Sequence, residues 1–450
     1  MHDAPIGLAT LIGIYFVGIE DSGKRSESQD ARCPHRGHGI YFVGIEDSDA
    51  QGRRFPNNIT SSSMDITTYE LLFSTKRYQK VDIRARYPRI FYNIYKNIEH
   101  ATSVEHDLRI MKTTRITKLK DVIKPSMGYL PSFASYHINT FSKNYITFLY
   151  NSPFNKSVTI HFIVEEMNIN AKIYKEHAEK IMSLLYFLAL YATKKKCTNK
   201  HLVIYIYMTS LAKEKPDKRN IDIGEKHVNT GYTIPCNNEV VIYRKEEWFK
   251  VLIHEMMHNY NLDFSGTQVD YQEKITEIMH IRIRVELFEA YSEFWAEMIN
   301  GCFVAYSVDF DESYDSFMSM LYRIVQTELF FKVLQMVKVL SLKRTSYYKL
   351  LFTNCIDYSE STNILSYYVF ATVLMFYFQD FISWCNKYNC NTIQFSNNKE
   401  CITQFCEFIK SHCKCRELFD YVDYVEHIYR NDIRNKNTLL GNTLRMTIYG

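Results

Sequence analysis

The chain has 450 residues and a mass of 53.4 kDa, which is enough for two or three domains with buried cores. Apolar residues make up 46% of it and charged residues 23%, a globular composition that excludes wholesale disorder. With 54 Lys and Arg against 50 Asp and Glu, the net charge of +4 is too small for the whole chain to behave as a polycation.

No apolar stretch is long enough to predict a membrane-spanning helix. The best candidate, residues 4–19, is shorter than the roughly 18 to 20 residues required, and it lacks the basic leader of a secretory signal. We therefore expect no membrane partner. The 11 cysteines, an odd number in a large chain, favour mostly free thiols and an intracellular, reducing compartment. Six of them lie within residues 385–415 at gaps that fit no zinc pattern, and helical spacing favours buried free thiols there.

The first 55 residues differ in character from the rest. Residues 13–22 recur unchanged as residues 39–48, and eight of the 15 glycines lie in this segment. Two copies are too few for a solenoid, which needs about three stacked units. We interpret residues 1–55 as a duplicated, flexible N-terminal extension and assign no function to it.

Residues 56–140 are interpreted as a mixed accessory region with a basic bias. Between residues 76 and 124, 13 Lys and Arg stand against five Asp and Glu. Residues 81–87 alternate between apolar and polar, which predicts a half-buried strand with a solvated face. Nucleic-acid binding is the less favoured alternative, because bases stack on aromatic rings where cations hold the phosphates. The interleaved aromatic residues are Tyr78, Tyr87, Phe91, Tyr92 and Tyr95.

From residue 141 onward the patterns predict an α+β fold. Apolar runs bounded by turn residues predict strands, and a long amphipathic segment predicts a helix between the second and third of them. The strands are expected at residues 145–150, 158–164, 201–208, 228–234 and 239–243, and the helix at 171–192. From about residue 245 to 429 the apolar spacing is helical. We take 141–430 as one domain, because a sheet followed by helices is typical of α+β proteins, and 431–450 as a polar tail.

The helix expected after residue 245 carries His254, Glu255 and His258, an HExxH sequence. Four residues are just over one helical turn, so both imidazoles project from one face and can bind a single metal ion. Zinc suits such a site, since it accepts N and O donors in a roughly tetrahedral arrangement. Glu255 is placed to approach a metal-bound water as a general base. The plainer alternative is a pair of buried histidines hydrogen-bonded on a core helix.

A catalytic zinc needs a third protein ligand and an open fourth position. Asn261 and Phe264 stand where the extended HExxHxxGxxH motif requires Gly and His, which excludes that subclass. Asp270 is a possible ligand with only a partial motif match. The stronger candidates are three carboxylates at four-residue intervals on one apolar helix: Glu289, Glu293 and Glu297.

With these two segments the sequence resembles the gluzincin zinc metallopeptidases. In that family the third ligand is a Glu on a second helix, and an acidic residue four positions later orients a ligating His. Residues 293–297, Glu-Phe-Trp-Ala-Glu, look like the ExxA[DE] form and the EFFAE stretch of toxin-type members. The resemblance implies Glu293 as the third zinc ligand and Glu297 as the carboxylate behind it. A frame moved by one turn would make Glu289 the ligand and Glu293 its support; we prefer Glu293.

The resemblance covers roughly residues 200–300 and implies a zincin-like fold, with a small mixed sheet, an active-site helix and a mainly helical C-terminal subdomain. It also implies a Zn²⁺ cofactor and a polypeptide substrate that binds along the strands at residues 229–243 and is hydrolysed by a metal-activated water, with Glu255 as base. A narrower similarity, to predicted metallopeptidases of large DNA viruses, rests on composition and on residues 244–254; the compartment would then be the host cytoplasm.

The motifs do not identify the residue that stabilises the oxyanion, and they leave alternatives to a peptidase open. The family stabilises the oxyanion with a Tyr, His or Arg, and we favour Tyr367 or Tyr368 at the start of a strongly apolar helix. The alternatives to a peptidase are a catalytically silent binding or virion-associated protein on a zincin scaffold and, less favoured, a nucleic-acid-binding protein that uses residues 76–124.

Overall fold

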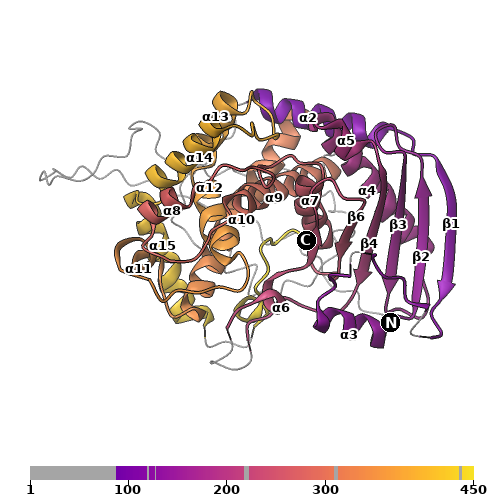
Figure 1. The fold of residues 1–450 in the computed structure, drawn as a ribbon, viewed down its shortest axis with the longest axis horizontal. Coiled ribbons are helices and arrows are strands. Elements are labelled where there is room, and N and C mark those ends of the chain that lie inside the picture. The colour runs from indigo at the N-terminus through magenta and orange to yellow at the C-terminus, as the bar shows by residue number, and fades with distance from the viewer. Residues whose placement is uncertain (1–87, 119–120, 127, 217–221, 309–312, 435–437) are drawn as a thin grey trace, which may run out of the picture. The chain divides into compact units, whose positions relative to one another are not determined.

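The computed structural model describes residues 88–450, apart from 119–120, 127, 217–221, 309–312 and 435–437 (Figure 1). The duplicated extension at 1–55 and the strand expected at 81–87 lie outside the described residues. All of the described residues belong to the unit formed by Ile83–Gly450.

One open six-stranded mixed sheet carries the order β1-β2-β3-β4-β6-β5 (Figure 1). Its strands are β1 Leu108–Arg115, β2 Asn144–Tyr150, β3 Ser157–Val164, β4 His201–Met208, β5 Gly231–Thr233 and β6 Glu239–Ile242. Strands β3, β4 and β6 are parallel, whereas β1, β2 and β5 run antiparallel to their neighbours. All five predicted strands are confirmed, although β5 is shorter than expected because Glu225–Val228 form the helical turn α6.

Helices cover both faces of the sheet and make up most of the chain after β6. Helices α4 and α7 pack on one face, and α3 packs on the other through Ala134 and Ile138. Helix α9 packs against α7, and α10 packs against α9. The bounds are α2 Pro88–Ser103, α3 Ser132–Phe141, α4 Ala171–Tyr191, α5 Lys195–Thr198, α6 Glu225–Val228, α7 Trp248–Asn259, α8 Gln272–Ile278, α9 Leu287–Ser307, α10 Tyr314–Leu342, α11 Tyr347–Phe352, η3 Leu365–Phe370, α12 Ala371–Phe376, α13 Phe378–Tyr388, α14 Lys399–His412, α15 Arg416–Ile428, η4 Tyr429–Ile433 and α16 Leu439–Asn442.

None of the helices in the described ranges is by itself long and apolar enough to cross a bilayer. Only the segments Leu365–Phe376 and Phe378–Tyr388, which meet at 90°, reach the required length and composition when they are counted together. The α+β class predicted from the sequence is therefore confirmed in its coarse form, a mixed sheet followed by helices.

The division at residue 140 is not a structural boundary. Strand β1 pairs with β2 across it, with Lys112 opposite Thr147, so the accessory region supplies an edge of the same sheet. Helix α2 was not predicted, and it buries Phe91 and Tyr95 against rings of later helices. Two of the five aromatic residues that suggested stacking on bases are thus core residues, because a half-apolar helix face needs a partner to cover it.

Residues 431–450 are not a separate polar tail. Leu444 and Thr447 are fully buried, and the backbone N–H groups of Met446 and Thr447 donate to Glu247 Oε1 at 2.8 and 2.7 Å. Glu328 accepts from Thr447 Oγ1 and from the N–H of Ile448. Polar composition alone suggested a solvated segment, but hydrogen bonds to buried carboxylates compensate for the burial of these polar groups.

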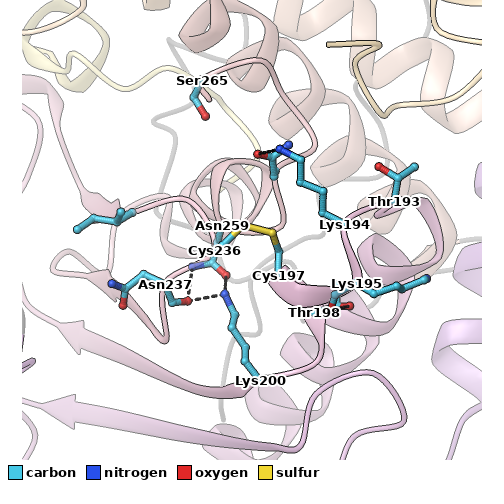
Figure 2. Close-up of a disulfide and its surroundings, with 12 residues drawn as sticks. Thr193, Lys194, Lys195, Cys197, Thr198, Lys200, Cys236, Asn237, Asn259 and Ser265 are labelled. Carbon is cyan, nitrogen blue, oxygen red and sulfur yellow. Dashed lines mark hydrogen bonds between the residues drawn. A yellow bond between two sulfur atoms is a disulfide. The ribbon is translucent and has the colours of Figure 1, made fainter. Parts of the chain in front are cut away.

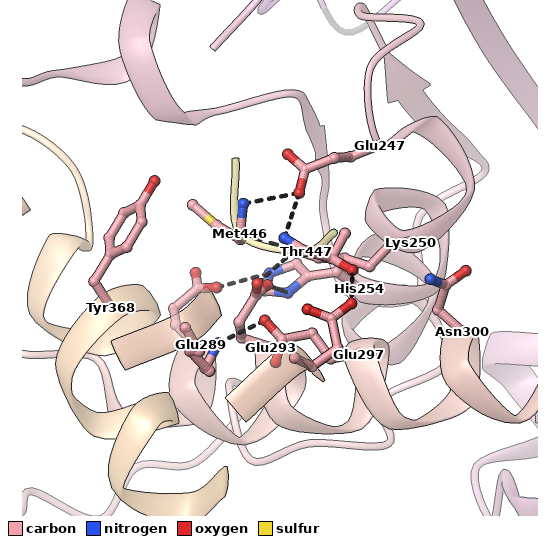
Figure 3. A network of polar contacts seen from close by, with 12 residues as sticks. Glu247, Lys250, His254, Glu289, Glu293, Glu297, Asn300, Tyr368, Met446 and Thr447 are labelled. Atoms are coloured by element: carbon pink, nitrogen blue, oxygen red, sulfur yellow. Dashed lines mark hydrogen bonds and ion pairs between the residues drawn. The ribbon is translucent and has the colours of Figure 1, made fainter. Parts of the chain in front are cut away.

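Glu247 anchors the start of the helix that carries the HExxH sequence. Its backbone lies in the left-handed region, with φ at 58°, and its fully buried carboxylate pairs with Lys213 Nζ at 2.8 Å. The same carboxylate accepts the amides of residues 446 and 447, so one side chain joins the loop after β4, α7 and the C-terminal segment (Figure 3).

Glu247→Gln is expected to lower the free energy of unfolding by about 3–5 kcal/mol, because it leaves Lys213 as an unpaired buried charge. Urea denaturation followed by circular dichroism measures the loss. Glu179→Gln is the control: Glu179 pairs with Lys175 at 3.6 Å on the half-exposed surface of α4, and its loss should cost under about 1 kcal/mol. Equal losses for the two variants would contradict the role given to Glu247.

A disulfide joins Cys197 in α5 to Cys236 in the β5–β6 turn (Figure 2). Beside the disulfide, Lys200 Nζ donates at 2.7 Å to the side-chain oxygen of Asn259, which is the last residue of α7. The expectation of mostly free thiols holds for seven cysteines of the described ranges, and the buried ones include Cys385, Cys401, Cys406 and Cys413. Cys390 is exposed rather than buried, and Cys415 is disulfide-bonded rather than free.

Replacing Cys197 and Cys236 together by Ser is expected to lower the free energy of unfolding by about 2–4 kcal/mol, since the bridge restrains the unfolded chain over a sequence separation of 39. Urea denaturation of the oxidised protein measures this, with Cys390→Ser as the exposed, free-thiol control. A double variant as stable as the control would contradict the prediction.

Candidate metal centre

The packing of α7 on α9 brings the HExxH residues to the three candidate carboxylates. His254 and His258 stand one turn apart on α7, and Glu289, Glu293 and Glu297 occupy successive turns of α9. All five side chains are largely buried, because α7 lies between the sheet and α9, and α9 is in turn covered by α10 and η3. Figure 3 shows His254 among the carboxylates of α9.

Three donor atoms converge at one point. His254 Nε2 lies 3.0 Å from Glu289 Oε2, His258 Nε2 lies 3.2 Å from the same oxygen, and the two Nε2 atoms are 3.0 Å apart. For bonds of about 2.0–2.1 Å, the donors of a tetrahedral zinc site lie roughly 3.3 Å apart. The triangle of His254, His258 and Glu289 therefore has the size of one face of such a site.

The other ring nitrogen of each histidine faces a carboxylate. His258 Nδ1 lies 2.5 Å from Asp263 Oδ2, and His254 Nδ1 lies 3.1 Å from Glu293 Oε2. A carboxylate at Nδ1 orients an imidazole and can accept the Nδ1 proton when Nε2 binds a metal. Both imidazoles present Nε2 to the shared point, as metal binding through this atom requires.

The position of Glu293 favours the alternative assignment, in which the third ligand lies one helical turn earlier. Its two oxygens are taken by Lys250 and His254 Nδ1, and it does not belong to the converging group. Glu297 pairs with Lys332 Nζ at 2.5 Å and touches neither histidine. Glu289 is the carboxylate at the shared point, and Glu293 is the support behind His254. The four-residue spacing could not choose among the three, because all of them share one face of α9.

Two further residues complete the surroundings of the triangle. Asn363 Nδ2 donates to Glu289 Oε1 at 3.1 Å, which fixes the carboxylate with its other oxygen toward the histidines. Asp263, the partner of His258, accepts from Ser292 Oγ at 3.2 Å. Asp263 was not predicted from the sequence; the available signal was an acidic residue five positions after the second His, just beyond the end of α7.

Of the other residues predicted for the site, two lie away from the centre and one lies beside it. Asp270 is exposed and accepts the N–H of Gln272 at the start of α8, so it is not part of the group. Tyr368 donates to the carbonyl of Leu444 at 2.6 Å, and Figure 3 shows its hydroxyl directed away from the histidines. The ring of Tyr367 lies 5.8 Å from that of His254, which leaves Tyr367 as the tyrosine beside the centre.

The charges around the centre favour a cation. Although burial lowers the pKa of His258, the negative charges of Asp263 and Glu289 outweigh it and raise that pKa well above its usual value. Burial would raise the pKa of Glu289, but the charge of His258 and hydrogen bonds from both imidazoles lower it. Burial raises the pKa of Glu255 to about 7. The negative charges of Asp263 and Glu289 thus favour positive charge at the imidazoles.

Comparisons with models of protein families, with curated proteins and with solved structures found no match. Function must therefore be inferred from the residues and geometry of the chain itself.

Zinc affinity separates the two possible ligand sets. Glu289→Ala removes a donor from the triangle and is expected to abolish tight zinc binding, whereas Glu293→Ala should weaken it by about 10- to 100-fold, as loss of a ligand's hydrogen-bond partner does. Zinc content after dialysis and competition with a chelator measure both, and Asp270→Ala is the control that should retain wild-type affinity. Retention by Glu289→Ala with loss by Glu293→Ala would reverse the assignment.

Proposed function

We propose that this chain is a zinc-dependent endopeptidase with a zincin-like fold of the gluzincin type, in which His254, His258 and Glu289 hold the metal. The observation that carries the proposal is the triangle of donor atoms with sides of 3.0, 3.0 and 3.2 Å, backed by a carboxylate at each Nδ1. A zinc ion bound there would polarise the scissile carbonyl and lower the pKa of its water to about 7.

Glu255 is proposed as the general base. It lies on α7 between the two histidines in sequence, it is buried, and its pKa is raised to about 7, where it can both accept and return a proton. Among the described residues no hydrogen bond or ion pair occupies its carboxylate. We expect it to take a proton from the attacking water and to give it to the leaving amine.

The edge strand β5 supports a polypeptide substrate. It lies along α7, where Asn259 Nδ2 donates to Thr233 Oγ1 at 2.9 Å, and its outer edge pairs with no described strand. A Cβ at Gly231 would come within 3.1 Å of Val251 on α7 and within 2.8 Å of the Val241 carbonyl, so a glycine is needed for this close approach. An extended peptide can add to such an edge by main-chain hydrogen bonds, beside the proposed metal.

Tyr367 is the proposed oxyanion donor. It precedes by one residue the tyrosine that is engaged with Leu444, and it is half-buried with its ring next to that of His254. A phenol hydroxyl directed at the developing negative charge of the tetrahedral intermediate would stabilise the transition state more than the substrate.

Glu255→Gln is expected to retain zinc with wild-type affinity and to lose peptide hydrolysis by about 10²- to 10⁴-fold, the usual contribution of a general base. Cleavage of a library of unstructured peptides, read by mass spectrometry, and zinc content are measured on the same samples. Wild-type protein that holds zinc and cleaves no peptide would replace this proposal by the catalytically silent scaffold.

A further inference from the structure

Lys250 lies one helical turn before His254 on α7, and only 1% of it is exposed. Its Nζ forms an ion pair with Glu293 Oε1, while Glu293 Oε2 lies 3.1 Å from His254 Nδ1. One carboxylate therefore bridges a buried lysine and an imidazole, and Figure 3 shows Lys250, Glu293 and His254 close together.

The interior contains comparable pairs that do not reach a histidine. Lys213 pairs with Glu247, and Lys332 pairs with Glu297, all four side chains being buried. Glu297 is the next acidic residue along α9 after Glu293, so Lys332–Glu297 has the same chemistry one turn further from the imidazoles. What distinguishes Lys250 is that its partner orients a proposed metal ligand.

We propose that Lys250 is a positioning residue of the metal centre, acting on His254 through Glu293. This role rests on the proposed metal site. By pairing with one oxygen of Glu293, Lys250 fixes that buried carboxylate with its other oxygen 3.1 Å from His254 Nδ1. The imidazole is then held with Nε2 at the shared point of the proposed metal site.

The contacts of Glu293 show why the lysine matters. Without Lys250, the buried carboxylate of Glu293 would lose the ion-pair partner that fixes its position. Its other oxygen would no longer be held at His254 Nδ1, and the imidazole could turn its Nε2 away from the shared point. Lys250 therefore orients a ligand that it does not touch.

Lys250 also contacts the C-terminal segment, through the side chain of Met446. Met446 Sδ lies 3.8 Å from Lys250 Nζ, and the N–H groups of Met446 and Thr447 are held by Glu247. The lysine is thus covered by a polarisable thioether and has Glu293 as its ion-pair partner.

Zinc affinity of four variants tests the proposal. Lys250→Met is expected to bind zinc about 10- to 100-fold more weakly than wild type, as is Glu293→Gln, the range found when the partner of a ligating histidine is lost. The double variant should be no weaker than Glu293→Gln alone, because Lys250 acts only through that carboxylate. Lys332→Met, the matched control, should keep wild-type affinity. Competition with a chelator and the absorption spectrum of the Co²⁺ form are the measurements.

Unchanged zinc affinity and an unchanged Co²⁺ spectrum in folded Lys250→Met would overturn the proposal, as would additive losses in the double variant. If Lys250→Met does not fold, Lys250→Arg is the variant that tests the role of Lys250. Its displaced positive charge should alter the Co²⁺ spectrum, and an unaltered spectrum would count against the proposal that Lys250 positions His254. If the wild-type protein binds no zinc, the proposed metal site is wrong and the role of Lys250 fails with it. If the wild-type protein binds zinc but hydrolyses no peptide, only the peptidase proposal fails, and the zinc affinities of the variants still decide the role of Lys250.

Discussion

Every carboxylate buried on α9 must be matched by positive charge, and this requirement organises the centre of the molecule. Taking an isolated carboxylate out of water costs several kcal/mol or more unless a partner compensates. Glu297 is compensated by Lys332 and Glu293 by Lys250. Glu289 has no lysine among its described partners; it faces the two imidazoles and an amide. The position that lacks a permanent cation is therefore the one at which the chain can accept an exchangeable one.

The sequence predicted the parts of this centre that depend on local spacing. The HExxH residues lie on a helix as four-residue spacing required, and the second helix with its three acidic residues lies against it. The choice between Glu289 and Glu293 was not local. It depends on Lys250 and Lys332, which reach α9 from two different helices, and no periodicity within α9 carries that information.

The strands that were predicted depend on local sequence, whereas the elements that were missed depend on partners far along the chain. Strands β2, β3 and β4 are apolar enough to be recognised individually, because they are buried in the sheet whatever their neighbours are. Helix α2 and the segment after Thr443 carry many polar residues, and their burial depends on partners far along the chain. Asp263 was missed for a related reason: an acidic residue in a loop is common, and only the fold places it at His258 Nδ1.

The clamp at Glu247 has a consequence for how the protein is made. Its carboxylate accepts amides that follow it by 199 and 200 residues, so Glu247 lacks part of its hydrogen bonding while those residues are still unsynthesised. Long-range contacts of this kind form late, since the intervening chain must first be ordered. The helix that carries the proposed metal ligands would therefore lack part of its anchoring on the ribosome until translation has passed residue 447.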